Sequence, residues 1–299
     1  MRIGRVASLS DTGRRRLRNE DAYVCDPPLF AIADGMGGAQ AGEIASRLAA
    51  TAIAERARGV QGEGAVAGLV QAANARVYRR ALEDPAAAGM GTTVTVGLFD
   101  GESGTITIGH VGDSRAYRIR EGRLEQLTAD HSLVAELVRT GRLTPEQAAE
   151  HPHRSVITRA VGTEPNVDVD TFTIEAAPGD LYLLCSDGLT DMVDDAEILA
   201  IAGAAEHVPE TVARLLVDAA NHAGGVDNIT VVAFEFVEGE PGPDSPYEEA
   251  VADETPPAQV VDASVRRRGA GKGGRALALL AVFVVFAAAA LVVMWSIRR

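Results

Sequence analysis

The sequence predicts an α+β fold built on antiparallel sheets, and two observations lead to that prediction. Hydrophobic residues recur at helical spacing in long alanine-rich stretches, whereas short β-rich runs follow one another directly between residues 92 and 127. Helices and strands are therefore segregated along the chain, which favours α+β over a doubly wound fold. With 299 residues and 46% hydrophobic content, the chain can bury a substantial core, as one large domain or two smaller ones.

The first half of the chain alternates between the two patterns in blocks. Strands are predicted at 3–9 and 22–34, and amphipathic helices that pack on a sheet are predicted at 40–58 and 64–83. Four β-rich runs come next, separated by glycine-containing dipeptides: 92–99, 104–110, 114–120 and 123–127. Consecutive short runs with such turns are typical of an antiparallel meander.

The second half begins with a polar, helical stretch at 131–152, where Thr144-Pro145 marks a helix start. Further strands and helices are expected beyond it. The predicted strands are 167–174, 180–185 and 229–237, and the predicted helices are 195–203 and 208–223. The folded domain is therefore expected to occupy residues 1–237.

Residues 238–275 differ in composition from the rest. Five prolines and eight acidic residues within 238–265 predict a disordered linker, which ends in a basic segment. Residues 276–297 contain no charged residue and would span about 33 Å as a helix, enough to cross a bilayer. A buried core helix is the alternative, but a transmembrane anchor is favoured. Five basic residues before this stretch and two after it predict a single-pass cell-membrane protein with a cytoplasmic N-terminal side.

Charge is distributed unevenly along the chain. The formal net charge is −14, and seven of the 28 basic residues lie from Arg266 onward, where no acidic residue occurs. The preceding body is therefore strongly acidic, which argues against a nucleic-acid partner and suits divalent cations. An ordinary soluble acidic surface is equally compatible with the charge alone.

Five aspartates share one sequence context, the junction between a strand and a turn. They are Asp21, Asp34, Asp113, Asp187 and Asp227. Any one alone is most simply a turn residue, but their recurrence suggests that one edge of a sheet sandwich gathers them. Converging carboxylates repel one another, and a divalent ion would remove that cost. An all-oxygen ligand set favours Mg²⁺ or Mn²⁺ over zinc.

Six ordered motifs carry a resemblance to a known family. They are Arg16-Leu17-Arg18-Asn19-Glu20-Asp21, Ala33-Asp34-Gly35-Met36-Gly37-Gly38, Gly91-Thr92-Thr93, Val111-Gly112-Asp113-Ser114-Arg115, Ser186-Asp187-Gly188-Leu189 and Asp227-Asn228-Ile229-Thr230. Over about residues 3–237 the chain resembles the type 2C metal-dependent protein phosphatases, in particular their bacterial, membrane-anchored branch. The resemblance implies a four-layer α-β-β-α sandwich of two antiparallel sheets.

The resemblance also implies a role for each motif residue. Two Mn²⁺ or Mg²⁺ ions would be held by Asp34, the Gly35 carbonyl, Asp187 and Asp227, with Glu20 and Asp21 on metal-bound waters. Asp113 with Asp187 matches a third, weaker metal site. Arg16 corresponds to the clamp on the substrate phosphate, for which a planar guanidinium is well suited.

The implied activity is hydrolysis of phosphoserine and phosphothreonine in proteins, opposing membrane Ser/Thr kinases and acting on their substrates. One departure from the family is Met36, where eukaryotic relatives have a histidine proposed to protonate the leaving group. A metal-bound water near Asp113 is the candidate replacement, ahead of His110. Two alternatives are a catalytically silent phosphoprotein-binding module and a phosphatase acting on an anti-sigma-factor antagonist. Intact motif residues argue against the first, and the second lacks the expected switch segments.

Overall fold

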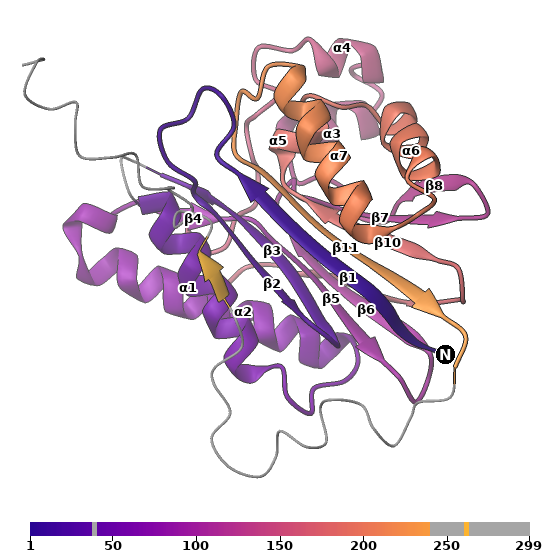
Figure 1. Ribbon diagram of the computed structural model, residues 1–299. Coiled ribbons are helices and arrows are strands. Elements are labelled where there is room, and N and C mark those ends of the chain that lie inside the picture. Colours follow the sequence, from indigo (N-terminus) through magenta and orange to yellow (C-terminus); the bar gives the residue numbers. More distant parts are fainter. Residues whose placement is uncertain (38–40, 240–259, 263–299) are drawn as a thin grey trace, which may run out of the picture. The chain divides into compact units, whose positions relative to one another are not determined.

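The computed structural model describes residues 1–37, 41–239 and 260–262. All of them belong to the first of two compact units, Met1–Ser264 and Val265–Arg299. In this unit two antiparallel sheets lie face to face, and helices cover the outer face of each (Figure 1). This arrangement confirms the predicted four-layer α-β-β-α sandwich.

The first sheet brings the two ends of the domain together. Its strand order is β1 (Arg2–Asp11), β11 (Ile229–Val237), β10 (Leu181–Cys185), β7 (Arg115–Arg120) and β8 (Arg123–Gln126). Its outer face is covered by α5 (Asp187–Thr190), α6 (Asp195–Ala204) and α7 (Pro209–His222). The last predicted strand, 229–237, has the observed bounds of β11, because its β-branched and aromatic residues run on without a glycine or proline.

The second sheet is formed mainly by the first half of the chain. Its strand order is β12 (Val260–Asp262), β2 (Asp21–Asp26), β3 (Leu29–Met36), β5 (Val94–Asp100), β6 (Thr105–Val111) and β9 (Asp170–Glu175), and β4 (Gly91–Thr92) pairs with β3. Its outer face packs on α1 (Ala41–Arg56) and α2 (Glu63–Glu83), which confirms the two alanine-rich helices. A short 3₁₀ helix, Pro85–Ala87, follows α2.

Strand alternation sends side chains into separate cores. In β3, Phe30 and Ile32 enter the core between the sheets, whereas their neighbours Ala31 and Ala33 pack against the helices. Phe30 stacks on Phe234 across that central core, with ring centroids 3.8 Å apart. Large apolar side chains thus join the sheets, and small ones allow the helices to approach.

Two predicted elements differ from the observed ones. The single strand predicted at 22–34 is a hairpin of β2 and β3, because Pro27 and Pro28 interrupt it. The predicted meander is wrong at its third strand: β5 and β6 pair in one sheet, whereas β7 and β8 pair in the other. The chain crosses between sheets at Gly112-Asp113, so this dipeptide is a crossover and not a hairpin turn.

The polar stretch after β8 forms two short helices, α3 (Leu133–Arg139) and α4 (Pro145–Ala149). Thr144 caps α4 in a capping box with Gln147, which confirms the helix start read from Thr144-Pro145. We call residues 133–158 the flap. They lie between β8 and the segment that leads to β9.

Part of the predicted linker departs from the disorder that its composition predicts. Val260–Asp262 forms β12 and pairs antiparallel with β2. The reason is local, since Val260 and Val261 have high strand propensity and β2 would otherwise present a free edge. Within the part of the chain that the structure describes, no helix combines the length and apolar character needed to span a bilayer. The predicted transmembrane helix 276–297 lies outside those residues.

Candidate active site

A cleft of about 430 Å³ lies where strand ends of both sheets meet the loops that follow them. It is lined by Arg16, Glu20, Asp34, Gly35, Met36, Gly37, Asp113, Arg154, Ser155, Ile157, Asp187, Gly188, Asp191, Met192, Val226 and Asp227. The structure therefore brings together seven of the eight predicted site residues, although they come from five separate parts of the chain. The eighth, Asp21, is buried behind Asp34.

Asp21 and Asp34 are opposite each other in the hairpin of β2 and β3. Oδ2 of Asp21 accepts hydrogen bonds from the hydroxyls of Ser186 at 2.9 Å and Thr230 at 2.5 Å. Burial raises the pKa of Asp21 to about 6, against the opposing effect of these two hydrogen bonds. Asp21 thereby ties the second sheet to the ends of β10 and β11 in the first.

Asp34 and Asp187 have the most strongly shifted carboxyls. Burial is the main cause that raises the pKa of Asp34, followed by the charges of neighbouring aspartates. Burial also raises the pKa of Asp187, with the charge of Asp113 as the next cause. Without a cation, this cluster would hold protons at pH values where aspartates are normally ionised.

Glycine makes close backbone approach possible at Gly35. A Cβ at this position would lie 2.1 Å from the Gly42 carbonyl oxygen and 2.6 Å from that of Glu20. The Gly35 N–H donates to the Glu20 carbonyl at 3.2 Å. The strand runs on to Met36, two residues beyond the predicted end at Asp34. Gly35 is therefore explained by close packing against the start of α1.

Asp113 is placed by the crossover between the sheets. Gly112 before it has a φ of 112°, which favours glycine, and a Cβ there would meet the Thr93 side chain at 2.6 Å. Burial raises the pKa of Asp113 to about 6, and the charge of Asp130 is the next cause. The side chain is only 8% exposed although it borders the cleft.

Three buried carboxylate oxygens have no hydrogen-bond partner among the described residues: Oδ1 of Asp21, Asp113 and Asp187. Buried, unpaired acceptors on clustered acids are costly unless a cation is present. No set of three or more His, Cys, Asp or Glu side chains in the described part of the chain has the arrangement to hold a metal ion as it stands. The donor chemistry fits hard divalent ions, because every candidate ligand is oxygen.

Arg16 is one of the two arginines that line the cleft, and its Nη2 lies 2.5 Å from Oδ2 of Asp227. Burial acts to lower the pKa of Arg16, but the hydrogen bond to Asp227 and the charge of Asp227 outweigh burial, so the pKa is raised. Asn228 fixes the surrounding loop, because its amide donates to the carbonyls of Thr12 and Arg18 and its Oδ1 accepts from the Glu20 N–H. The sequence singled out the motif but not this role for Asn228.

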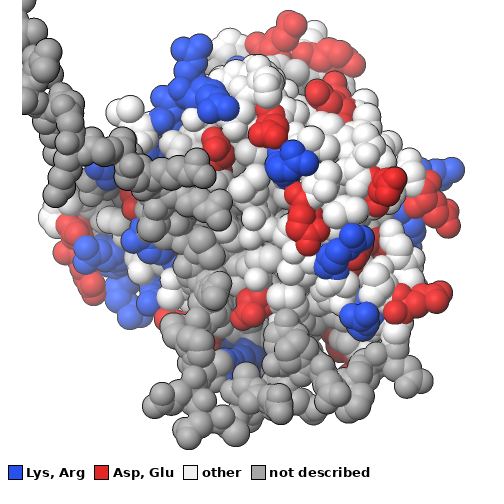
Figure 2. All heavy atoms as spheres, viewed as in Figure 1, with Lys and Arg blue, Asp and Glu red and all other residues white. Residues whose placement is uncertain are grey.

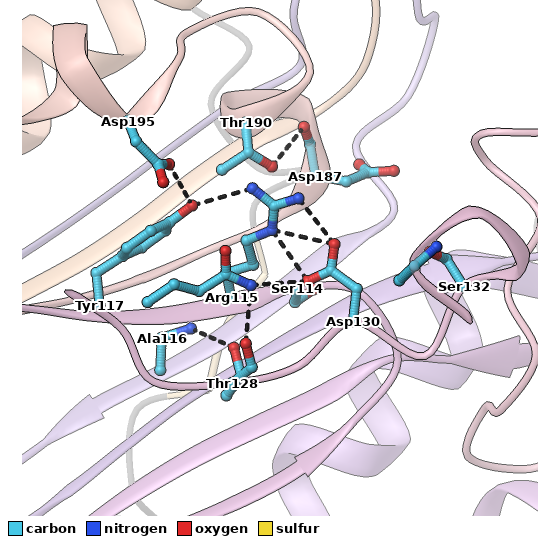
Figure 3. Close-up of polar contacts among 12 residues, drawn as sticks. Ser114, Arg115, Ala116, Tyr117, Thr128, Asp130, Ser132, Asp187, Thr190 and Asp195 are labelled. Carbon is cyan, nitrogen blue, oxygen red and sulfur yellow. Dashed lines mark hydrogen bonds and ion pairs between the residues drawn. The ribbon is translucent and has the colours of Figure 1, made fainter. Parts of the chain in front are cut away.

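A second network, which sequence reasoning missed, supports the crossover from the side of the first sheet (Figure 3). Arg115 donates from Nε and Nη2 to the Asp130 carboxylate, and from Nη1 to the Tyr117 hydroxyl. Tyr117 in turn donates to Asp195 at the start of α6. The signal available in the sequence was the presence of Arg115 two residues after Asp113 and of Asp130 after the segment that forms β8. The sequence does not show that these two residues pair.

His110 is not placed to replace the acid that is missing at position 36, because it is buried and does not line the cleft. Met36 lines the cleft, as predicted for the family position. His110 is fully buried in β6 and burial lowers its pKa to about 4.

The flap contributes Arg154, Ser155 and Ile157 to the cleft wall. Asp191, one helical turn after Asp187 in α5, is a further lining acid that the sequence analysis did not identify.

The family model described as protein phosphatase 2C matches residues 13–222, which include every motif except Asp227-Asn228. The chain belongs to this family. Among similar proteins, it is 42% identical over 247 residues to a serine/threonine protein phosphatase PstP of Mycobacterium tuberculosis, covering 81% of this chain and 47% of that protein. It therefore spans about half the length of the first curated relatives it matches. A serine/threonine phosphatase stp of Listeria welshimeri is 37% identical over 76% of this chain and 93% of its own.

Solved structures of the family superpose on the described domain. The crystal structure of the Mycobacterium tuberculosis phosphatase PstP has a TM-score of 0.74 and 40% identity, covering 79% of this chain and all of that one. The PstP catalytic domain in complex with two manganese ions has a TM-score of 0.72 and 39% identity, covering 79% of this chain and 99% of that one. These findings confirm the family resemblance and the fold that it implies.

Proposed function

We propose that this chain is a metal-dependent protein phosphatase that hydrolyses phosphoserine and phosphothreonine. The observation that carries the proposal is the cleft itself, in which the guanidinium of Arg16 lies beside buried carboxylates with unpaired oxygens. Hydrolysis of a phosphate monoester needs charge stabilisation on the phosphoryl oxygens and an activated water. The similarity to named serine/threonine phosphatases supports the same activity.

The residues present fit two Mn²⁺ or Mg²⁺ ions. Asp34, the Gly35 carbonyl, Asp187 and Asp227 would hold the pair, and Asp113 with Asp187 would hold a weaker third ion. Glu20 and Asp21 would accept hydrogen bonds from metal-bound waters. When bound, such ions supply Lewis acidity that makes hydroxide available near neutral pH. The solved relative with two manganese ions supports this assignment.

The protein's own residues bind and orient the substrate. Arg16 would donate two parallel hydrogen bonds to the phosphate, replacing its contact with Asp227. Asp21 would remain in place through Ser186 and Thr230, so the strand ends keep their spacing as substrate enters. Met36 carries no proton to give, so the leaving serine or threonine oxygen would take its proton from a water molecule in the cleft and leave as a hydroxyl.

We also propose that the enzyme acts at the cell membrane. Support comes from the sequence alone: the 22 uncharged residues 276–297 and the basic residues that precede them. The catalytic domain would be cytoplasmic, tethered by the linker. Its partners would be phosphorylated proteins, in particular membrane Ser/Thr kinases and their substrates, because tethering raises their local concentration.

The catalytic proposal is tested with the full chain, an aryl phosphate and Mn²⁺. Turnover should require Mn²⁺ and be abolished by a chelator, and calorimetry should show binding of at least two ions. Asp218→Asn on the exposed face of α7 is the matched control for Asp187→Asn, since it removes a carboxylate away from the cleft. Turnover that persists without any divalent ion would overturn the two-metal assignment.

The membrane proposal needs a separate measurement. Cells that express the full chain are fractionated, and the protein should sediment with membranes. A protease site introduced near residue 265 should release an active soluble domain from the cytoplasmic side. Recovery of the intact chain in the soluble fraction would contradict the anchor without affecting the catalytic proposal.

A further inference from the structure

Exposed hydrophobic side chains gather around the cleft. Among the described residues, four large hydrophobic residues are exposed: Leu17 at 94%, Leu82 at 69%, Val226 at 50% and Val156 at 44%. Leu17 directly follows Arg16, Val226 lines the cleft, and Val156 stands between two lining residues of the flap. Only Leu82, in α2, lies elsewhere. Exposed apolar side chains that cluster at a site commonly mark a binding surface.

Hydrogen bonds tie the loop that carries Leu17 to the turn that carries Val226. The N–H groups of Arg14 and Arg15 donate to the Gly225 carbonyl at 2.7 and 3.2 Å. The Asn228 amide holds the carbonyls of Thr12 and Arg18, at the two ends of the loop. This loop is therefore tied along its length to the turn that carries Val226, so Leu17 and Val226 belong to one supported surface.

The same loop carries positive charge on an otherwise acidic protein. Arg14 and Arg15 are exposed, and neither forms an ion pair with another described residue. Basic side chains gather at the upper left of the view in Figure 2, over the loop that joins β1 to β2 in Figure 1. On the flap, Arg154 has one long contact to Asp191 at 3.9 Å. Because the net charge of the chain is −14, an acidic partner finds few positively charged surfaces on it other than this loop.

We propose that Arg14, Arg15, Leu17 and Val226, the basic–apolar rim, bind the substrate polypeptide beside its phosphorylated residue. The rim selects substrates with a large apolar side chain next to the phosphorylated residue and acidic residues one or two positions further. The backbone of Arg14 and Arg15 is bonded to Gly225 and the Arg16 side chain to Asp227, on either side of Val226, so a polypeptide whose phosphate binds at Arg16 brings its neighbouring residues to this loop and turn. This inference rests on the proposed phosphatase function and defines its substrate class.

The test uses the full chain with Mn²⁺ and four phosphothreonine peptides, with leucine or alanine next to the phosphothreonine and with glutamate or lysine beyond it. The leucine–glutamate peptide should have the highest kcat/KM. Leu17→Ser should lower it about tenfold for that peptide, the effect expected from losing burial of one leucine, and should abolish the preference for leucine. Leu82→Ser is the matched control, because it removes another exposed leucine, in α2 and away from the cleft.

The charge contribution is tested with the double variant Arg14→Gln/Arg15→Gln. It should remove the preference for glutamate over lysine and weaken the dependence of peptide KM on salt. Arg79→Gln, on the exposed face of α2, is the control. For both rim variants, aryl phosphate turnover should stay within about twofold of the wild type, since so small a substrate does not reach the rim.

The outcomes separate the two proposals. Equal kcat/KM for all four peptides, or an equal loss in Leu17→Ser and Leu82→Ser, overturns the rim while leaving the phosphatase intact. A wild type that cleaves no aryl phosphate overturns the phosphatase. In that case the rim proposal is tested by fluorescence anisotropy of the labelled leucine–glutamate peptide. The peptide must bind more weakly to Leu17→Ser than to Leu82→Ser.

Discussion

His131 and Gly112 hold each other through a reciprocal pair of hydrogen bonds. The His131 backbone N–H donates to the Gly112 carbonyl at 2.7 Å, and the Gly112 N–H donates to Nδ1 of the His131 ring at 3.0 Å. Nδ1 of the ring accepts this bond, and Nε2 lies 3.1 Å from Oδ2 of Asp170 and 2.9 Å from Nη1 of Arg159. The residue before Asp113 is thus held by His131, in the loop that leads to the flap.

Replacing His131 with alanine should loosen the crossover. We expect His131→Ala to lower the free energy of unfolding by about 2 kcal/mol, because the buried Gly112 N–H loses its acceptor. Hydrogen exchange at the Gly112 amide should accelerate. His153→Ala, on the exposed part of the flap, should change stability by less than about 0.5 kcal/mol. Equal effects of the two variants in urea denaturation would show that the clamp contributes nothing.

Asp187→Asn should separate catalysis from stability. It removes a ligand and should reduce aryl phosphate turnover to background. In the absence of metal the same variant should be more stable than the wild type at pH 8. It removes a carboxyl whose ionised form is disfavoured by burial and by the charge of Asp113. Thermal denaturation in chelator measures this. A lower melting temperature than that of Asp218→Asn would contradict the electrostatic account.

Arg16→Lys should retain the charge but lose bidentate geometry. We expect kcat/KM for aryl phosphate to fall about 100-fold, whereas Arg79→Lys should have no effect. Metal affinity measured by calorimetry should change little, since lysine can still approach Asp227. An Arg16→Lys variant with wild-type kcat/KM would show that the guanidinium does not hold the phosphate.

Metal binding should release protons, and more at pH 6 than at pH 9. Burial raises the pKa of both Asp21 and Asp113 from 3.8 to about 6, so these carboxyls carry protons near pH 6 that a cation must displace. Mn²⁺ affinity should therefore rise with pH. Calorimetry in buffers of different ionisation enthalpy counts the protons, and binding without proton release would refute the predicted shifts.

The same shifts predict how the metal-free fold responds to pH. A raised carboxyl pKa contributes stability that is fully present below about pH 3.8 and is lost as pH rises through about 6. The metal-free protein should therefore lose less stability on going from pH 7 to pH 5 than the Mn²⁺-bound protein does. Urea denaturation at the two pH values, with and without chelator, gives the comparison.

The Arg115–Asp130 pair should be a major local determinant of stability. Asp130→Asn leaves a largely buried guanidinium without its charge partner and should cost about 3 kcal/mol. Glu125→Gln, in the exposed pair with Arg118, should cost less than about 1 kcal/mol. Urea denaturation of both variants checks the difference, and similar values would contradict the importance of burial.

Much of the fold could be predicted because its signals are local. Strand 229–237 and helices 40–58 and 64–83 were recognisable because hydrophobic periodicity depends only on which face of each element is buried. The partition of β7 and β8 into the first sheet could not be predicted, because β6 and β7 are separated by a short glycine-containing link that serves a hairpin or a crossover equally well.

The candidate site likewise contains residues that could be predicted from the sequence and contacts that could not. Arg16, Asp34, Asp113, Asp187 and Asp227 were identified in the sequence because each stands in a motif at a strand end. Ser186, Thr230 and Asn228 stand in the same motifs, but their supporting roles were not predicted, since each bonds to a residue at least 165 positions away along the chain. Nothing in a hydroxyl or amide residue's neighbours along the chain reveals such a partner.

The sequence by itself determined the family, the α+β class and which acids converge, because motifs, periodicity and strand–turn junctions are written in consecutive residues. Only the tertiary structure decided that Asp21 lies behind Asp34, that His110 is sealed in the core and that Leu17 stands exposed beside Arg16. Burial and orientation are properties of packing between distant segments. They set pKa values, leave carboxylate oxygens unpaired and form the basic–apolar rim, and none of them is encoded within a single stretch of chain.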